Sequence, residues 1–431
     1  MTARIQAQPP ALRVRWRIFA FLFAFGLLAY VQQKSITVAA ARIMPDLSLS
    51  QQQIGWLEQA FVIGYALFQM PGGLFGQRFG ARLTFVIIGL MACGAMLATA
   101  AGPMLLGGRA LFFELLGVQL LLGIAQAAIF PVSAGVFETW FPPGRWPAVQ
   151  GLQTMGLQLG AAMTPPLIAF LMQGFGWQRA LYWTTLPALG VIGWWAWYAR
   201  NDPARHPAMT AAELAEIGTH VAAAAVKPVG AGRLLRLLGD RNVLLLATSY
   251  LCMNYVFYLL ANWVFLYLVQ ERHFSILEGG WLAGAPPLAA AVGAGLGGLL
   301  TGLACRRYGT RAGFRLVPLI ALPAAGLLLL VAVNCANPFL AVGTLALCYG
   351  FVELTEGAYW AAAMTVGGGD TMAVSGFMNT GGNLGGIVGI PLIAYLSGHQ
   401  DWHAAFLVGT GFAFVSAAAW LGIDAGRTTA R

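Results

Sequence analysis

Two carboxylates, Glu353 and Glu356, stand close together inside a long apolar stretch of the chain. They are three residues apart and share one face if the stretch is helical. An ionised side chain at the centre of a membrane costs about 2.5–3.5 kcal/mol, so two acids there indicate a use. Two neighbouring acids in a low dielectric cannot both ionise comfortably, and one is expected to exchange a proton near physiological pH. We therefore predict that they bind a coupling proton, with Glu356 preferred because Tyr359 and Trp360 follow it one turn on. A static hydrogen-bond network is the alternative.

Lys34 is a basic residue inside the first apolar stretch. A lysine at that depth is expensive, and it would attract an anionic solute or pair with Glu353 and Glu356 across a cavity. The alternative is that its side chain extends to the membrane interface. Two further acids, Glu58 and Glu114, lie nearer the ends of apolar stretches, where interfacial water would satisfy them.

Neutral polar and aromatic side chains also occupy positions in the middle of apolar stretches. Around a cavity they would suit a solute with hydroxyl and carboxyl groups, because each hydroxyl needs a hydrogen-bond partner once it loses water. Any one of them could instead join two helices. The candidates for substrate binding are Tyr30, Tyr65, Gln158, Asn254, Tyr258, Asn262, Tyr359, Trp360, Asn379 and Asn383.

Twelve apolar runs carry these residues, each roughly 18 to 26 residues long, which is the length of a helix that crosses a bilayer. The first six runs are 18–41, 52–75, 83–103, 110–135, 148–172 and 179–199. The second six are 243–269, 278–304, 316–334, 339–365, 373–396 and 404–423. The chain is therefore predicted to be an all-α membrane protein with twelve transmembrane helices in two six-helix repeats.

Composition and charge agree with this class. Hydrophobic residues make up 59% of the chain and charged residues only 9%, whereas soluble proteins carry about 25% charged residues. Nineteen of the 24 basic residues lie in the two tails and in the connections after even-numbered spans, so these segments are predicted to face the cytoplasm. Anionic lipid headgroups would balance the net charge of +9, and no aromatic-interleaved basic patch indicates nucleic acid.

A polar stretch, 200–242, separates the two sets of spans and contains Asn201-Asp202-Pro203 and Lys227-Pro228. Such proline-rich polar segments are typical of linkers, and one short helix is expected at 210–225. The prediction is an N-terminal half at 1–199, a cytoplasmic linker at 200–242 and a C-terminal half at 243–431.

The connection after the second span resembles the loop motif of the major facilitator superfamily, Gly-x-Leu-x-Asp-Arg-x-Gly-Arg-Arg. The motif positions are held by Gly73, Gln77, Arg78, Gly80 and Arg82, with Gln77 in place of the aspartate. Glycines let helix ends approach closely, and arginines can satisfy helix C-terminal carbonyls. A weaker copy at 305–311 follows the eighth span. The resemblance implies the major facilitator fold and a role for this loop in conformational change.

A narrower resemblance covers most of the chain and is to the anion:cation symporter branch, which carries sugar acids such as galactonate and hexuronates and includes vesicular anion transporters. The matching stretches are Tyr65-x3-Gln69-x-Pro71-Gly72-Gly73; Phe130-Pro131 followed by Trp140-Phe141-Pro142; Gly156-x-Gln158-x-Gly160; Tyr267-Leu268-Val269-Gln270-Glu271-Arg272; and Gly376-Phe377-x-Asn379-x3-Asn383-x-Gly385-Gly386-Ile387.

The chain departs from that branch at the branch's charged positions. An Asp-Arg pair in the first span is replaced by Gln32 and Gln33, and an arginine and a glutamate in the fourth span by Gln119 and Gln126. Glutamine can hydrogen-bond a substrate but does not change its charge near neutral pH. Gln119 and Gln126 therefore join the predicted substrate-binding residues, while proton coupling has to use other groups.

These observations predict a secondary transporter that moves a small organic anion, a sugar acid or carboxylate, by alternating access with a coupling proton or cation. Export of an amphiphilic or neutral compound and a non-transporting solute sensor are the alternatives. The five histidines have no nucleophile or metal spacing around them and no Walker motif occurs, so neither an enzyme nor a cofactor or metal site is expected. The expected setting is the bacterial inner membrane, with both termini cytoplasmic and the chain a monomer.

Overall fold

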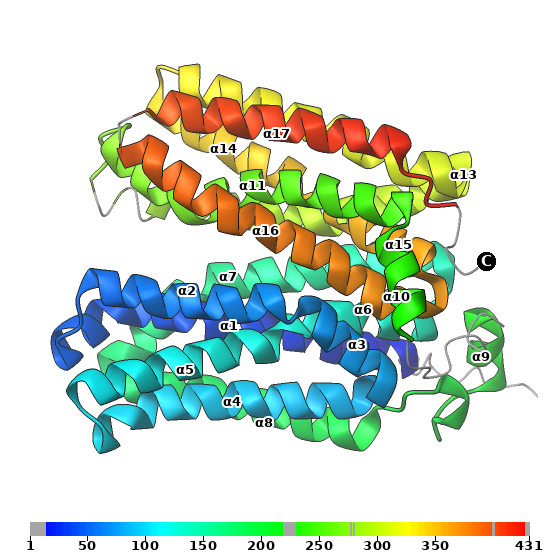
Figure 1. Ribbon diagram of the computed structural model, residues 1–431, viewed down its shortest axis with the longest axis horizontal. Helices are drawn as coiled ribbons and strands as arrows, with labels where there is room; N and C mark the ends of the chain where they lie inside the picture. Colours follow the sequence, from blue (N-terminus) through cyan, green and yellow to red (C-terminus); the bar gives the residue numbers. More distant parts are fainter. Residues whose placement is uncertain (1–13, 219–229, 276–277, 279–280, 399–400, 427–431) are drawn as a thin grey trace, which may run out of the picture.

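The computed structural model describes residues 14–218, 230–275, 278, 281–398 and 401–426, and these residues form helices and loops without a β-strand (Figure 1). The helices of the first part are α1 (Val14–Leu47), α2 (Gln51–Leu67), α3 (Gln69–Phe79), α4 (Ala81–Leu105), α5 (Gly108–Ala127), α6 (Ile129–Trp140), α7 (Trp146–Phe175) and α8 (Trp177–Tyr198). The polar stretch contributes α9 (Ala211–Ile217) and α10 (Ala231–Leu238).

The second part continues with α11 (Arg241–Gln270), α13 (Ala285–Asn334), α14 (Pro338–Glu353), α15 (Glu356–Gly367), α16 (Thr371–Gly398) and α17 (Trp402–Gly422). Short 3-10 turns lie at Pro143–Arg145, Pro203–Arg205 and Gly368–Asp370. Eight helical stretches of the described chain are long and apolar enough to cross a membrane, and two of these, Ala285–Asn334 and Pro338–Ser397, each hold two crossings. With α2–α3 and α8 they give the twelve membrane-spanning helices of the predicted fold.

Two spans of the first part are broken where a proline requires it. Pro71 and Pro131 lie four residues after Leu67 and Ala127, the last residues of α2 and α5. A proline lacks the N–H that would bond the carbonyl four residues earlier, and its ring clashes with that carbonyl. The breaks between α2 and α3 and between α5 and α6 follow from this geometry.

The two loops that the sequence pairs have the same backbone geometry. Gly80, between α3 and α4, has φ 85° and ψ 152°, and Gly309, inside α13, has φ 80° and ψ 166°. Only glycine adopts such values without strain. Gly309 thus divides α13 into crossings at 285–308 and 310–334, which supports the repeat that the loop motifs indicate.

Close glycine packing also recurs in the two parts. A Cβ atom added at Gly123 of α5 would collide with the carbonyl oxygen of Phe61 on α2, and one added at Gly297 of α13 would collide with that of Leu354 beside α14. Small residues at helix crossings let two backbones approach within van der Waals contact, which drives helix association in membranes. The second and fourth spans, and the eighth and tenth, are joined in this way.

The spans form two groups, α1–α8 and α11–α17, which lie together at the end that carries α9 and α10 and diverge toward the other end (Figure 1). We call these the linker end and the far end. At the linker end α9 is fixed to the start of α1, because the Glu213 carboxylate accepts hydrogen bonds from the backbone N–H groups of Val14 and Arg15. The Arg15 side chain is buried there and bonds Glu216.

The predicted spans agree with the helices to within several residues at their ends. The short helix predicted at 210–225 begins as α9, and its residues after 218 lie outside the described chain, as do both tails and part of the start of the predicted span 278–304.

We predict that Gly297→Ala destabilises the protein, because the new methyl group has to push α13 away from the α14–α15 break. Overpacking of this kind costs about 1–3 kcal/mol. Thermal unfolding of the purified protein in detergent measures the effect. Gly343→Ala on the exposed face of α14 is the control, since nothing lies within 4 Å of its added Cβ. Equal melting temperatures for both variants would contradict the prediction.

Candidate functional site

Polar side chains from both groups of helices meet between the two groups, toward the middle of the spans. Tyr30 of α1 lies within Coulombic range of Tyr65 on α2, Tyr258 on α11, and Tyr349 and Glu353 on α14. We call the full set the central polar cluster, which consists of Tyr30, Tyr65, Gln69, Gln158, Tyr250, Tyr258, Tyr349, Glu353, Glu356, Asn379 and Asn383. The cluster joins residues that are up to several hundred positions apart in the sequence.

Glu356 is the first residue of α15 and is held by two donors. Its Oε2 atom accepts hydrogen bonds from Trp360 Nε1 at 2.7 Å and from the Tyr250 hydroxyl at 3.2 Å. The side chain is 5% exposed. Both donors and the partial positive charge at the start of a helix stabilise a carboxylate. Burial still opposes the charge of Glu356, but these contacts make its ionised form less costly than it would be without donors.

Glu353 has the opposite surroundings. It is the last residue of α14, where the helix carries partial negative charge, and it is 1% exposed. The Gln158 side chain approaches it from α7, yet Oε2 of Glu353 and Nε2 of Gln158 both lack a partner within hydrogen-bonding distance. A buried carboxylate without donors is costly in its ionised form. The break between α14 and α15 thus gives two neighbouring acids different preferences for a proton.

Amide side chains of α16 complete the cluster and cross between the two groups of helices. Asn379 Nδ2 donates to Gln69 Oε1 on α3 at 2.8 Å, and the Tyr65 hydroxyl faces both amides. One turn further, Asn383 Oδ1 accepts from the Tyr258 hydroxyl at 2.9 Å. The hydrogen bond between Asn379 and Gln69 therefore joins the two groups of helices within the cluster.

Lys34 lies one helical turn from Tyr30 on α1 and therefore on the same helix face, toward the far end. Its charged neighbour is Glu58 on α2, which is exposed. No ion pair joins Lys34 to Glu353 or Glu356. The predicted pairing is therefore not formed, because Glu58 lies closer to Lys34 and the two glutamates sit deeper in the bundle.

Several predicted substrate residues point away from the cluster. The Tyr359 hydroxyl bonds Ser249 at 2.6 Å and Ser416 at 2.9 Å, which ties α15 to α11 and α17. The Asn254 amide donates to the Tyr250 carbonyl of its own helix, and Asn262 is exposed. The hydrogen bonds of Tyr359 and Asn254 thus stay within the second group of helices.

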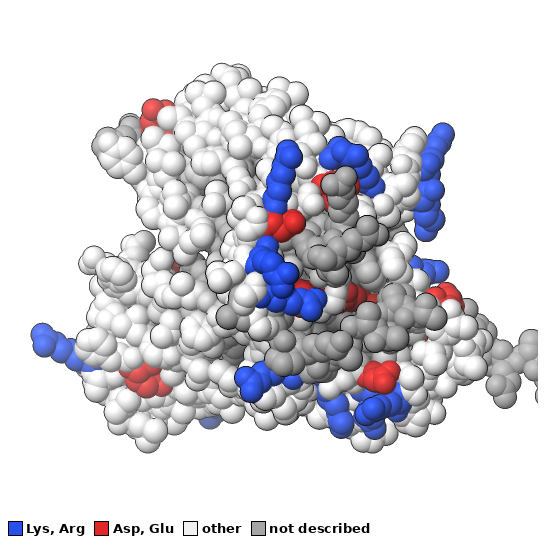
Figure 2. All heavy atoms as spheres, turned by 45° about the vertical axis from the view of Figure 1, so that its right-hand side comes forward, with Lys and Arg blue, Asp and Glu red and all other residues white. Residues whose placement is uncertain are grey.

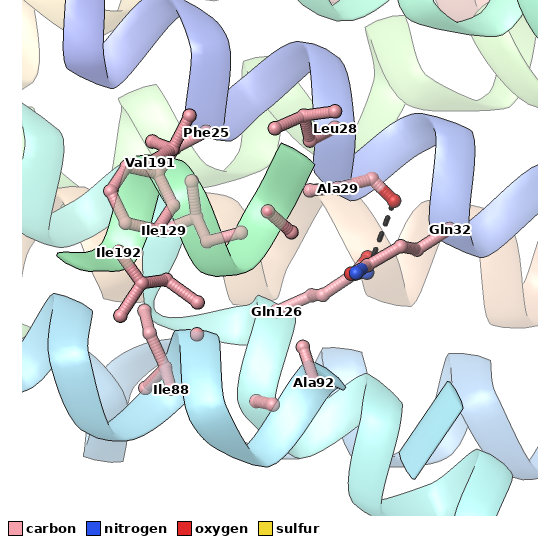
Figure 3. A pocket seen from close by; sticks show the side chains of 13 residues that line it. Phe25, Leu28, Ala29, Gln32, Ile88, Ala92, Gln126, Ile129, Val191 and Ile192 are labelled. Carbon is pink, nitrogen blue, oxygen red and sulfur yellow. Dashed lines mark hydrogen bonds between the residues drawn. The ribbon is translucent and has the colours of Figure 1, made fainter. Parts of the chain in front are cut away.

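Gln32 and Gln126 lie together in a hollow inside the first group of helices (Figure 3). Gln126 Nε2 donates to the Ala29 carbonyl at 3.1 Å, so it ties α5 to α1. The hollow is about 20 Å³ and otherwise apolar, which is room for one water molecule. Gln119, two turns earlier than Gln126 on the same face, is buried with Nε2 unpartnered.

A second polar contact closes the linker end. Gln77 Nε2 donates to Asp370 Oδ1 at 2.8 Å and to the Gly369 carbonyl at 3.0 Å, and Arg233 Nε of α10 lies 2.6 Å from Asp370 Oδ2. Asp370 directly precedes α16 and is buried. A hollow of about 50 Å³ beside this contact is lined by Gln77 and Glu138 among others. Figure 2 shows basic side chains gathered over this end.

The other motif residues shape the same end. Gly73 packs against the Met372 carbonyl at the start of α16, where a Cβ atom would collide. The Arg82 side chain donates to the Ala196 carbonyl at the end of α8. Arg78 is exposed with its guanidinium over the Phe79 ring. Gly80 makes the turn into α4.

Sequence reasoning missed Tyr250, Tyr349, Asp370 and Arg233. A usable signal existed for Tyr250, which precedes Asn254 by one turn, and for Asp370, a lone acid between two apolar spans. In the described residues no group of three His, Cys, Asp or Glu side chains is placed to hold a metal ion.

The model of the Major Facilitator Superfamily matches residues 22–373. A probable sulfoacetate transporter of Cupriavidus necator is 27% identical and covers 89% of this chain and 88% of its own. The hexuronate transporter of Bacillus subtilis is 27% identical, with coverage of 92% and 91%. A D-galactonate transporter of Escherichia coli is 25% identical, with coverage of 98% of both chains.

Solved structures with the same fold have little sequence similarity. The proton:xylose symporter XylE, bound to 6-bromo-6-deoxy-D-glucose, superposes with a TM-score of 0.77 at 12% identity, over 95% of this chain and 96% of its own. The transporter FucP in the outward conformation gives 0.72 at 14% identity, over 96% and 100%.

We predict that Gln77→Asp destabilises the linker-end contact, because two carboxylates would then face each other at the start of α16. Adding Asp370→Asn restores an amide–carboxylate pair in the reverse direction and should recover the loss. A coupling energy of about 0.5–3 kcal/mol is expected for side chains in contact. Melting temperatures of the two single variants and the double variant measure it. Additive effects would contradict the prediction.

Proposed function

We propose that this chain, which belongs to the Major Facilitator Superfamily and is a secondary transporter, carries a small organic anion together with a proton. The proposed anion is a sugar acid or carboxylate. The family consists of transporters, so the protein is an integral membrane protein with a small-molecule substrate and not an enzyme. The names of three relatives that match over most of their length, for sulfoacetate, hexuronates and galactonate, support an anionic substrate.

The observation that carries the coupling proposal is the placement of Glu353 and Glu356 on the two sides of a helix break, between the halves of the bundle. We propose Glu353 as the proton carrier rather than Glu356, which the sequence favours, because the end of α14 and an unpartnered Oε2 atom oppose the charge of Glu353. The two donors of Glu356 make its ionised form less costly. The titratable groups that face Glu353 are Tyr30 from α1, Tyr250 from α11, Tyr349 one turn earlier on α14, and Glu356. Gln158 from α7 is its neutral neighbour.

Substrate binding is proposed at the central polar cluster, with Lys34 attracting the anion. Tyr30, Tyr65, Gln158, Asn379 and Asn383 would bond its hydroxyl groups, each through a group at the interface between the halves. Separation of the halves at the linker end would break the Asn379–Gln69 hydrogen bond. Opening of the site to the linker end would then depend on whether a solute occupies the cluster.

Orientation and setting follow from the charge distribution. We propose that the linker end, with α9, α10 and most basic residues, faces the cytoplasm of a bacterial inner membrane. The diverging far end would then open outward. The division at 1–199, 200–242 and 243–431 and a monomeric working unit remain predictions of this proposal.

In proteoliposomes of the purified protein, an inward proton gradient should drive accumulation of a labelled sugar acid or sulfoacetate. One pH unit supports up to about tenfold accumulation for one proton per solute. Glu353→Gln cannot release a proton and should abolish gradient-driven accumulation while allowing exchange of labelled for unlabelled solute. Glu114→Gln, in the fourth span, is the matched control. Accumulation that is independent of the gradient in the wild type would refute proton coupling.

Lys34→Gln should raise the KM for an anion by about tenfold or more, because a charge-assisted contact contributes about 1.5–3 kcal/mol. Uptake at saturating solute should change less. Arg179→Gln at the start of α8 is the control for a basic residue away from the cluster. An unchanged KM in Lys34→Gln would place the anion elsewhere, and transport of neutral solutes by the wild type would favour the export alternative.

A further inference from the structure

The two buried carboxylates lack a cation from the protein. Glu353 and Glu356 are both at least nine-tenths buried, and no basic side chain of the described residues forms an ion pair with either. Lys34 lies beside Glu58, and Arg272 near the far end donates to the carbonyls of the α13 terminus. An unpaired buried charge is strongly unfavourable, so each acid is either protonated or meets a positive charge from outside the protein.

One proton neutralises only one of the two acids. The helix break opposes the charge of Glu353 more than that of Glu356, whose donors Tyr250 and Trp360 both bond Oε2. The second oxygen, Oε1, accepts no hydrogen bond from the described residues. A hydroxyl donor stabilises a carboxylate, but it doesn't cancel its charge. The negative charge of Glu356 therefore remains open to a cationic group.

The two side chains that bond this carboxylate belong to a group of packed aromatic rings. The Tyr250 ring lies 4.9 Å from that of Tyr359 and 6.3 Å from that of Trp360, and Phe130 from the other half lies 5.3 Å from Trp360. Ring faces attract ammonium groups, most strongly where water is excluded. A carboxylate among tyrosine and tryptophan rings is the chemistry that recognises a positively charged nitrogen.

A second feature that points to a bound ligand is an unpaired amide beside the two acids. Gln158 is 2% exposed, its side chain approaches Glu353, and its Nε2 atom has no hydrogen-bond partner. Buried polar groups in folded proteins are nearly always paired. An unpaired amide donor beside the acids fits a hydroxyl or carboxyl oxygen of a bound solute.

We infer that the substrate, in addition to the acidic group of the proposed function, carries an ammonium group that binds at Glu356. The inference rests on that proposed function and narrows its substrate class to zwitterions. Lys34 supplies the anionic pole, one helical turn from Tyr30 toward the far end, and Glu356 supplies the cationic pole deeper in the bundle. The proton on Glu353 and the ammonium on Glu356 together balance the two acids.

Uptake of matched compounds into proteoliposomes tests the inference. Each pair keeps the acidic group and exchanges one hydroxyl for an ammonium: D-gluconate and D-glucosaminate, L-glycerate and L-serine, and isethionate and taurine. In at least one pair the amino compound is expected to have a kcat/KM about tenfold higher, because only it pairs with Glu356. Glu356→Gln should bring this ratio down to about one.

Glu114→Gln is the control and should keep the wild-type ratio, since Glu114 packs against Gly102 of α4 within one half. Where Glu356→Gln does not fold, the wild-type ratios decide. Ratios near one or below in every transported pair overturn the inference and leave the proposed function intact. Uptake of none of the six compounds contradicts both, whereas uptake of an amino compound without a response to the proton gradient contradicts only the coupling.

Discussion

The protein depends on the break between α14 and α15, which separates two buried acids that a continuous helix would place in one environment. Glu353 ends one helix and Glu356 begins the next, so the helix dipoles act on them in opposite directions. The break contains no proline. It is instead packed against Gly297, whose missing side chain lets α13 meet the Leu354 carbonyl, and Thr355 satisfies the Val352 carbonyl. Helix packing in the second half thus sets the electrostatics of the site.

The helix breaks of the first half carry no acidic side chain. Pro71 and Pro131 cause these breaks, each four residues before the proline. The buried amides Gln32 and Gln126 line an otherwise apolar hollow, and Gln126 ties α5 to α1. An amide can be satisfied by backbone carbonyls inside one half, whereas a carboxylate needs donors or a cation. This difference fits the placement of Gln32 and Gln126 inside one half and of Glu353 and Glu356 between the halves.

The sequence was sufficient for the twelve spans and for the paired loops, because apolar length and glycine placement are direct consequences of the bilayer and of backbone sterics. It also singled out Glu353, Glu356, Asn379 and Asn383, which the structure brings together in the central polar cluster. It could not give side-chain direction: the proximity of Lys34 to Glu58 and the use of Tyr359 within its own half depend on helix rotation. Nor could it pair Gln77 with Asp370, since these residues are 293 positions apart.

The contacts that cross between the halves have strengths suited to a protein that must open and close. Gln77–Asp370 and Gln69–Asn379 each use an amide. A net hydrogen bond contributes about 0.5–1.5 kcal/mol between neutral groups and about 1.5–3 kcal/mol to a charged group such as a carboxylate. Moving an equilibrium from 1:99 to 99:1 requires about 5.5 kcal/mol, which exceeds what two such bonds supply. A state closed at the linker end therefore needs glycine packing at Gly73 and Gly151 as well as these bonds. Under the proposed function, binding of charge at the acids would shift this balance, because Glu356 lies on α15, which packs against α7 of the first half and against α16, the helix that carries Asn379.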